Sequence, residues 1–383
     1  MKYYSTDKQA PLASLEEAVV KGLAGDKGLY MPEHIRPLDK DTISDLKNKS
    51  FHEIACTVAR AFFGEDIEPE TLDAIVRDTL SFETPVVPVR DNIYSLELFH
   101  GPTLAFKDVG GRFMARLLGY FIKKEGLKQV NVLVATSGDT GSAVANGFLG
   151  VPGIHVYVLY PKGKVSPIQE CQFTTLGQNI TALEVDGTFD DCQALVKSAF
   201  MDEELNRHMK LTSANSINVA RFLPQSFYYF NAYAQLDKMG KADELVVSVP
   251  SGNFGNITAG LFAHRMGLPI KRFVAAKTAT MYSWNICVQV STHRVLPYRP
   301  SPMLWMSAIR VISHVSWTCT GRMAIRTRKS SNWSAVTVSR MKRSGYHEAG
   351  LRRNKLYTGP ARRLRLSGVD RKRAGSGRNR FVP

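Results

Sequence analysis

The first 276 residues alternate between stretches with the apolar spacing of helices and short apolar runs typical of buried strands. The segments that begin at Leu15 and Pro69 repeat apolar residues at helical intervals after capping residues, which predicts helices. Apolar runs of strand length recur at 130–135, 155–160 and 245–249. Such strands in alternation with helices are typical of a parallel sheet covered on both faces. The pattern therefore predicts an α/β fold.

Lys107 lies between a strand-like segment at 94–99 and an amphipathic helix for which Asp108 is the expected N-cap. A helix start carries partial positive charge and disfavours a cation, and apolar neighbours would lower the pKa of the ammonium further. A neutral amine is what Schiff-base chemistry with an aldehyde requires. On this segment alone, a lysine that simply flanks a helix remains the favoured interpretation.

Two glycine-rich loops follow Lys107, at 136–141 and 250–256, and each connects a predicted strand to a predicted helix. Glycines and small hydroxyl residues at a helix start let backbone N–H groups approach an anion. Neither loop matches a Walker A or GxGxxG pattern, so neither gives specific support for nucleotide binding. Loops at equivalent ends of parallel strands converge on one crevice, which predicts a single site built from both loops and the lysine.

Four motifs, in this order, resemble those of the threonine synthase family. They are residues 100–108, 136–143, 215–221 and 250–256, and the segments 1–6 and 27–32 are similar to the family's N-terminus. The resemblance covers residues 1 to about 276. It implies the PLP-dependent fold type II, similar to the tryptophan synthase β subunit, with two α/β lobes and a helical N-terminal region. The implied domains are 1–90, helical; 91–276, an incomplete pyridoxal-phosphate (PLP) core; and 277–383, an aberrant basic tail.

The resemblance also assigns roles to residues. Lys107 would hold PLP covalently and then move protons as base and acid. The other implied cofactor-binding residues are Asp139, Ser251, Gly252, Asn253, Phe254, Gly255 and Asn256. The implied substrate-binding residues are Thr136, Ser137, Gly138, Thr140, Asn215, Asn218 and Arg221. Arg221 could meet a phosphate bidentately, and a structural cap or interdomain contact is an equal alternative for it.

The implied reaction converts O-phospho-L-homoserine and water to L-threonine and phosphate, with PLP as the electron sink. Threonine dehydratase and cysteine synthase share the fold type and remain alternatives. No metal site is expected, because His347-Glu348 lacks the second histidine of a zinc motif and the five cysteines show no ligand spacing. The oligomeric state stays open between monomer and homodimer. No apolar run reaches the length of a membrane span and the N-terminus has no apolar signal region, which argues for a cytoplasmic protein.

The net charge of +16 is concentrated at one end of the chain. From Lys277 onward there are 22 Lys and Arg residues and only 2 Asp and Glu, which leaves 28 basic and 32 acidic residues before that point. All four tryptophans lie in the same tail, and no clear helix or strand period is expected beyond Met323. The mildly acidic body argues against a nucleic-acid partner, although a basic arm with aromatic residues remains an alternative.

The family continues beyond the phosphate loop with more sheet, further helices and a polar residue at the pyridine nitrogen. That continuation is not found here, and the abrupt loss of acidic residues favours a tail translated out of frame. Without the continuation found in the family, apolar sheet edges would lose their cover, and the cofactor ring would lose the residue that contacts its nitrogen. We therefore expect this polypeptide to fold poorly and to have little or no activity.

The frame-shift hypothesis makes a prediction about the gene. Past codon 277, one of the other two reading frames is expected to remain open and to encode a continuation with an ordinary number of acidic residues. The nucleotide sequence of this region is the measurement, and the absence of any such frame would refute the hypothesis.

Overall fold

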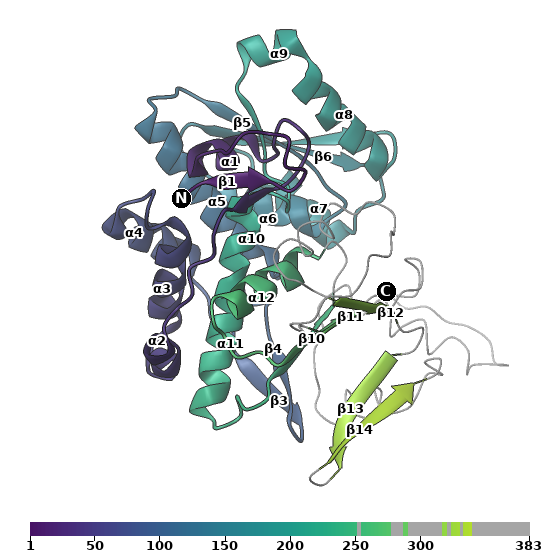
Figure 1. Ribbon diagram of the computed structural model, residues 1–383. Coiled ribbons are helices and arrows are strands. Elements are labelled where there is room, and N and C mark those ends of the chain that lie inside the picture. Colours follow the sequence, from purple (N-terminus) through teal and green to yellow (C-terminus); the bar gives the residue numbers. More distant parts are fainter. Residues whose placement is uncertain (251–253, 277–285, 290–315, 320–322, 330–331, 339–383) are drawn as a thin grey trace, which may run out of the picture. The chain divides into compact units, whose positions relative to one another are not determined.

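The computed structural model of the protein describes residues 1–250, 254–276, 286–289, 316–319, 323–329 and 332–338 (Figure 1). One compact unit comprises Met1–Val86 and Leu96–Ser339, and Val87–Ser95 belongs to a second unit. The described part of the second unit comprises most of strands β3 (Val86–Arg90) and β4 (Ile93–Leu96), which form a two-stranded sheet, and the two-residue turn between them. The described residues that are expected at the functional site all belong to the first unit.

The N-terminal region of the first unit is mainly helical. Strands β1 (Tyr3–Ser5) and β2 (Tyr30–Pro32) pair antiparallel. The helices are α1 (Leu15–Lys21), α2 (Lys40–Asp45), the 3-10 turn η1 (Leu46–Asn48), α3 (Phe51–Phe63) and α4 (Pro69–Thr79). Ser50 and Glu53 form a capping box at the start of α3, and Pro69 occupies the first turn of α4. The helices predicted from Leu15 and Pro69 are confirmed.

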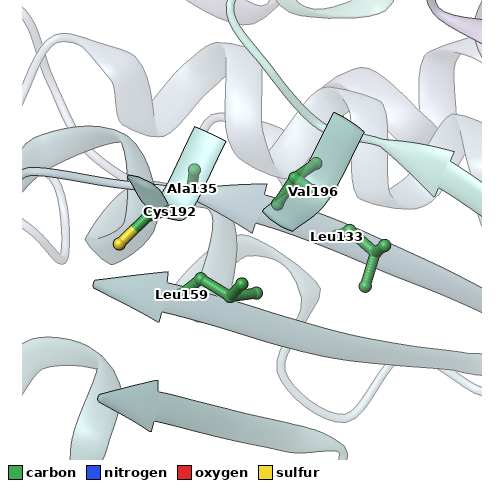
Figure 2. Close-up of a cluster of buried hydrophobic side chains, with 5 residues drawn as sticks. All are labelled: Leu133, Ala135, Leu159, Cys192 and Val196. Atoms are coloured by element: carbon green, nitrogen blue, oxygen red, sulfur yellow. The ribbon is translucent and has the colours of Figure 1, made fainter. Parts of the chain in front are cut away.

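The first unit contains a four-stranded parallel sheet. Its strand order is β7 (Ile180–Val185), β6 (Ile154–Pro161), β5 (Val130–Ala135), β8 (Leu211–Ser213). Val132 and Val134 are fully buried on one face of β5. Successive strand residues face opposite sides. On the other face, Leu133, Ala135 and Leu159 pack against Cys192 and Val196 of helix α8 (Phe189–Met201), as Figure 2 shows. The expected parallel sheet with two covered faces is confirmed.

Helices α5 (Lys107–Lys124) and α6 (Asp139–Phe148) pack together and carry the two segments most important for the site (Figure 1). Their backbones approach closely where neither helix has a side chain. A Cβ atom on Gly111 would lie 2.6 Å from the carbonyl oxygen of Ala143, and one on Gly147 would lie 2.8 Å from the backbone of Gly111. These glycines therefore set the distance between the two helices.

The remaining helices connect these elements. They are α7 (Pro167–Thr174), α9 (Glu203–His208), α10 (Val219–Phe222), the 3-10 turn η2 (Leu223–Gln225), α11 (Ser226–Lys238) and α12 (Gly255–Arg265). None of the helices in the described ranges is long and apolar enough to cross a membrane.

The C-terminal strands correct one expectation. Strands β9 (Val246–Pro250) and β10 (Arg272–Ala276) are parallel, and β11 (Ile286–Gln289) and β12 (Ser316–Cys319) extend their sheet in antiparallel fashion. Strands β13 (Met323–Lys329) and β14 (Asn332–Val338) pair antiparallel. The expectation that nothing beyond Met323 has a strand period was wrong. Ile325 and Thr327 alternate there with arginines, and β-branched residues favour strands even where the surrounding composition is very basic.

The close approach of α5 and α6 predicts the effect of single methyl groups. Gly111→Ala places its methyl against a backbone carbonyl that cannot rotate away, so we expect a net loss of about 1–3 kcal/mol despite the higher helix propensity of alanine. Gly119→Ala, in the same helix, meets only a methyl group of the Val151 side chain at 3.2 Å. Urea unfolding of both variants is the measurement, and equal stabilities would show that the glycine contact does not constrain the helices.

Candidate functional site

Lys107 is the first residue of α5, and Phe106 occupies the N-cap position without a side-chain cap. The expectation that Asp108 is the N-cap was wrong. The N-cap lies two residues earlier, and the Asp108 carboxylate accepts hydrogen bonds from the backbone N–H of Thr103, at 2.9 Å, and from the Thr103 hydroxyl. The loop before the helix turns back sharply enough to bring Thr103 over the first turn. Burial raises the pKa of Asp108, and the hydrogen bonds from Thr103 oppose this change.

The loop that presents Lys107 is conformationally strained. Leu104 has a φ of 57°, a left-handed conformation unfavourable for a side chain of this size, and it is half exposed. A Cβ atom on Gly101 would lie 2.4 Å from Oδ2 of Asp108, so only glycine fits there. Strain of this kind costs roughly 1–3 kcal/mol and persists where the surrounding structure enforces it, often at functional sites. The buried Asp108 carboxylate is the group around which this loop is built.

The Lys107 ammonium points toward the start of α6. Its Nζ donates a hydrogen bond to Oγ1 of Thr140 at 2.9 Å and lies 5.9 Å from the centre of the Phe106 ring. Burial lowers the pKa of Lys107; the negative charge of Asp139 opposes this change, and the positive charge of Arg221 reinforces it. The amine is thus more easily deprotonated than an exposed lysine. This supports the nucleophilic role expected for it.

The loop between β5 and α6 is held in shape by one hydroxyl group. Thr136 is buried, and its Oγ1 accepts hydrogen bonds from the N–H groups of Gly138, at 3.0 Å, and Gly141, at 2.8 Å. Ser137 is exposed beside them, while Asp139 and Thr140 are partly buried in the first turn of α6. Gly138 has a φ of 144°, which strongly favours glycine. Ser137 and Thr140 present polar groups at the carboxyl end of β5, whereas the Thr136 hydroxyl stabilises the loop.

The segment after β8 lies at the same end of the sheet, because β8 runs parallel to β5. Asn215 and Ser216 are half-buried. Asn218 caps α10 through its Oδ1, which accepts from the N–H of Ala220 at 2.9 Å, and its Nδ2 donates to the carbonyl of Val19 at 2.8 Å. Both atoms of the Asn218 amide are therefore engaged in contacts that stabilise the fold. Substrate binding by this residue remains a prediction.

Arg221 is the most unusual side chain near the site. It is fully buried, and burial lowers its pKa to about 10 although the negative charge of Asp108 opposes the change. Its Nη1 donates to the carbonyl of Ala214, while Nε and Nη2 have no hydrogen-bond partner in the described part of the chain. Buried donors without partners are costly, at about 1–3 kcal/mol each. The guanidinium therefore offers two donors to an anion.

The expected phosphate loop is described only in part, because Ser251, Gly252 and Asn253 lie outside the described residues. Phe254 is buried and left-handed, with a φ of 60°, and Gly255 begins α12. The Asn256 side chain donates to the carbonyl of Pro250 at 2.9 Å and accepts from the N–H of Ile257. The loop thus ends at the N-terminus of an 11-residue helix, where backbone N–H groups favour an anion.

Three neighbours of the site were not expected from the sequence. The Tyr228 hydroxyl of α11 donates to the carbonyl of Phe106 at 2.7 Å, directly before Lys107. Gln169 and Gln172 of α7 donate to Asp139 and to the carbonyl of Thr103. These contacts join residues far apart in the chain. The Ser166–Gln169 spacing of a capping box and Pro167 directly after the cap are sequence signals that could have drawn attention to α7.

His100 and the described cysteines act as ordinary structural groups. His100 pairs with Glu97 at 2.9 Å and packs against the Phe99 ring. Cys56 and Cys192 are buried and Cys171 is exposed, all as free thiols. Within the described ranges, no group of three or more metal-ligating side chains forms a metal site.

The burial of Lys107 predicts how stability depends on pH. Because its pKa is lowered on folding, the unfolded chain holds a proton that the folded chain releases between the lowered pKa and the ordinary value of 10.5. Stability due to this group therefore rises with pH across that window. Lys107→Met removes the buried charge, so we expect it to be more stable than the wild type at neutral pH, with a difference that shrinks toward pH 10.5. Urea unfolding at several pH values is the measurement, with Lys123→Met on the same helix as control. A difference that does not change with pH would contradict this account.

The described residues suit the cofactor implied by the resemblance. PLP carries an aldehyde and a phosphate, and the site combines an amine of lowered pKa with the unpaired buried donors of Arg221 and the start of α12. A Cβ atom on Gly138 would lie 2.4 Å from Oε1 of Gln169. Position 138, in the loop beside the amine, therefore accommodates only a glycine. Of these groups, the Lys107 amine and the Arg221 guanidinium lie close enough for their charges to interact.

Known protein families and individual proteins are similar to this chain in sequence. Residues 2–80 match the family "Threonine synthase N terminus", and residues 80–327 match the family "Pyridoxal-phosphate dependent enzyme". The threonine synthase of Escherichia coli is 49% identical over 276 residues, which is 72% of this chain and 64% of that protein. The threonine synthase of Haemophilus influenzae is 50% identical over 279 residues, or 73% of this chain and 64% of that protein. The chain thus spans less than two thirds of the length of either relative.

Solved structures agree with the sequence matches. The crystal structure of threonine synthase from E. coli superposes with a TM-score of 0.68 at 48% identity, covering 73% of this chain and 65% of that one. A PLP-bound threonine synthase from Brucella melitensis superposes with a TM-score of 0.68 at 41% identity, covering 72% of this chain and 60% of that one. The expected fold class is confirmed. The chain belongs to the family of pyridoxal-phosphate dependent enzymes, and its first 80 residues carry the threonine synthase N terminus.

Proposed function

We propose that this chain derives from a threonine synthase, an enzyme that converts O-phospho-L-homoserine and water to L-threonine and phosphate. The observation that carries the proposal is the placement of the Lys107 amine, with its lowered pKa, 2.9 Å from Thr140 at the start of α6. The relatives at 49% and 50% identity are threonine synthases, which supports this substrate over those of other enzymes of the fold type. The whole reaction is a proposal, because the chain spans 64% of their length.

Lys107 has two roles in this proposal. Its amine, whose pKa is lowered by burial, would hold the cofactor through the cofactor aldehyde. Once the amine of the substrate has displaced it, the freed Lys107 amine would accept and return protons at the α- and β-carbons of the substrate. PLP, when bound, supplies the electron sink that makes those carbons acidic. The Thr140 hydroxyl, which accepts from Nζ, and the Phe106 carbonyl, held by Tyr228, orient the amine.

The remaining residues bind charged groups of the substrate and cofactor. Ser137, Gly138 and Thr140, with the N-terminus of α6, suit the substrate carboxylate, while Asp139 would lie beside the cofactor ring. The unpaired donors of Arg221 suit a phosphate, which a guanidinium can bind bidentately. The loop at 251–256 would hold the cofactor phosphate. Phosphate then leaves from the γ-carbon of the substrate and water adds at the β-carbon.

We further propose that this polypeptide has little or no activity. The alignments with the bacterial relatives cover 276 and 279 residues, which supports a change in the chain near residue 277, where acidic residues almost disappear, although the match to the pyridoxal-phosphate family extends to residue 327. The same proposal includes three domains, at 1–90, 91–276 and 277–383. It also includes the out-of-frame origin of the last domain and a cytoplasmic location. The residue that contacts the pyridine nitrogen in the family has no counterpart that we can identify.

The test compares the full chain with a version whose reading frame is restored after codon 276. The restored protein is expected to absorb at about 410–420 nm with PLP, as lysine-bound PLP does, and to release phosphate from O-phospho-L-homoserine. The chain as it stands is expected to release phosphate at least about 100-fold more slowly, because missing contacts misplace the reacting groups. Lys107→Ala in the restored protein is the matched control and should abolish both signals.

Two results would contradict the proposal. Phosphate release by the unaltered chain at the rate of the restored one would refute its inactivity. Formation of 2-oxobutyrate from threonine, without phosphate release from O-phospho-L-homoserine, would instead identify a threonine dehydratase.

A further inference from the structure

Helix α7 contacts both loops that build the site. It begins at Pro167, after the N-cap Ser166, and places Gln169 and Gln172 on one face, three residues apart. Gln169 reaches the loop before α6, and Gln172 reaches the loop before α5. None of the roles assigned from the family resemblance falls on this helix.

Gln169 is locked in place by contacts at both ends of its amide. Its Nε2 donates to Oδ1 of Asp139, and its Oε1 accepts from the hydroxyl of Ser166 at 3.0 Å. Its backbone carbonyl accepts from the hydroxyl of Ser142 at 3.2 Å. The amide fills the space that a Cβ atom on Gly138 would need. The side chain is therefore held in one orientation by contacts at both ends of its amide.

Gln172 joins the same helix to the lysine loop. Its Nε2 donates to the carbonyl of Thr103 at 3.2 Å. Thr103 in turn donates to the buried Asp108 carboxylate, next to Lys107. A shift of α7 would thus be transmitted to both sides of the lysine.

Three charged groups act on or beside the Lys107 amine. Asp139 acts from α6 and Arg221 from α10, and Asp108 follows in α5 with its carboxylate engaged by Thr103. Of these, Asp139 is the anion whose charge acts on the Lys107 ammonium. A direct ion pair between the two would favour the charged amine and oppose attack on an aldehyde.

We propose that Gln169 is a positioning residue, which holds the Asp139 carboxylate in a fixed orientation and keeps it from pairing with Lys107, while Gln172 couples α7 to the lysine loop. The inference rests on the proposed function, because it takes Lys107 as the cofactor-binding lysine. The amide of Gln169 acts only through Asp139. Loss of the amide would free the carboxylate to turn toward the ammonium.

The experiment measures how readily the Lys107 amine reacts in the full chain without cofactor. Competitive acetylation with acetic anhydride, followed by mass spectrometry, gives the reactivity of Lys107 relative to the exposed Lys123 as a function of pH. Gln169→Met keeps the length of the side chain but removes the donor, and Gln169→Glu places a second negative charge beside Asp139. The matched control is Gln193→Met on the exposed face of α8.

In the Gln169→Met variant, Lys107 is expected to react about threefold more slowly than in the wild type at pH values below the midpoint of the Lys107 profile. The reason is that the variant favours the charged form of the amine. Gln169→Glu should slow it further, and Gln193→Met should leave it unchanged. In an Asp139→Asn background, Gln169→Met should have no effect, because the charge through which it acts is gone. A purely structural role would lower thermal stability without this dependence on Asp139.

The inference is overturned if both Gln169 variants react like the wild type, or if the slowing persists in the Asp139→Asn background. Because acetylation requires neither PLP nor O-phospho-L-homoserine, its outcome is separate from that of the phosphate-release test. An inactive chain can still show the Asp139-dependent slowing, and an active restored enzyme can still lack it.

Discussion

The contact between α5 and α6 is the constraint on which the site depends. Gly111 and Gly147 let the two helix backbones meet without intervening side chains, so that the first turns of both helices come together at one end of the sheet. Lys107 and Thr140 lie in these turns and therefore reach hydrogen-bond distance. A bulkier residue at either glycine would separate the helices and remove the lysine from its partner before any catalytic group was altered.

The same arrangement gathers charges that would be unfavourable in isolation. Lys107, Asp108 and Arg221 are removed from water to different degrees, and burial shifts the pKa of each toward its neutral form. Thr103 partly satisfies Asp108, and the carbonyl of Ala214 partly satisfies Arg221. The strained Leu104 turn and the unpaired guanidinium donors are two further departures from optimal stability. Their concentration around one lysine is consistent with a site that binds an anionic cofactor and substrate.

Local sequence patterns predicted the regular elements well and their ends less well. The strand 130–135 and the helix that begins at Pro69 were expected from periodicity, because burial of a continuous face leaves a regular apolar spacing. The helix start at Lys107 was misplaced by two residues, because the tight turn through Thr103 takes the Asp108 carboxylate away from the capping role that its residue type favours. The strand at 323–329 was missed because its basic composition obscured its alternation.

The sequence by itself determined the α/β class, the lysine and the family, since motifs of several residues in a set order carry that information locally. The tertiary structure decided which contacts hold the lysine in place. Gln169 and Tyr228, which the sequence did not indicate, approach the site from different helices. No local pattern encodes contacts such as Lys107–Thr140 and Phe106–Tyr228, whose residues lie 33 and 122 positions apart. The reason is physical: such contacts arise only when glycine-mediated helix packing and the parallel order of the strands bring distant segments to the same end of a sheet.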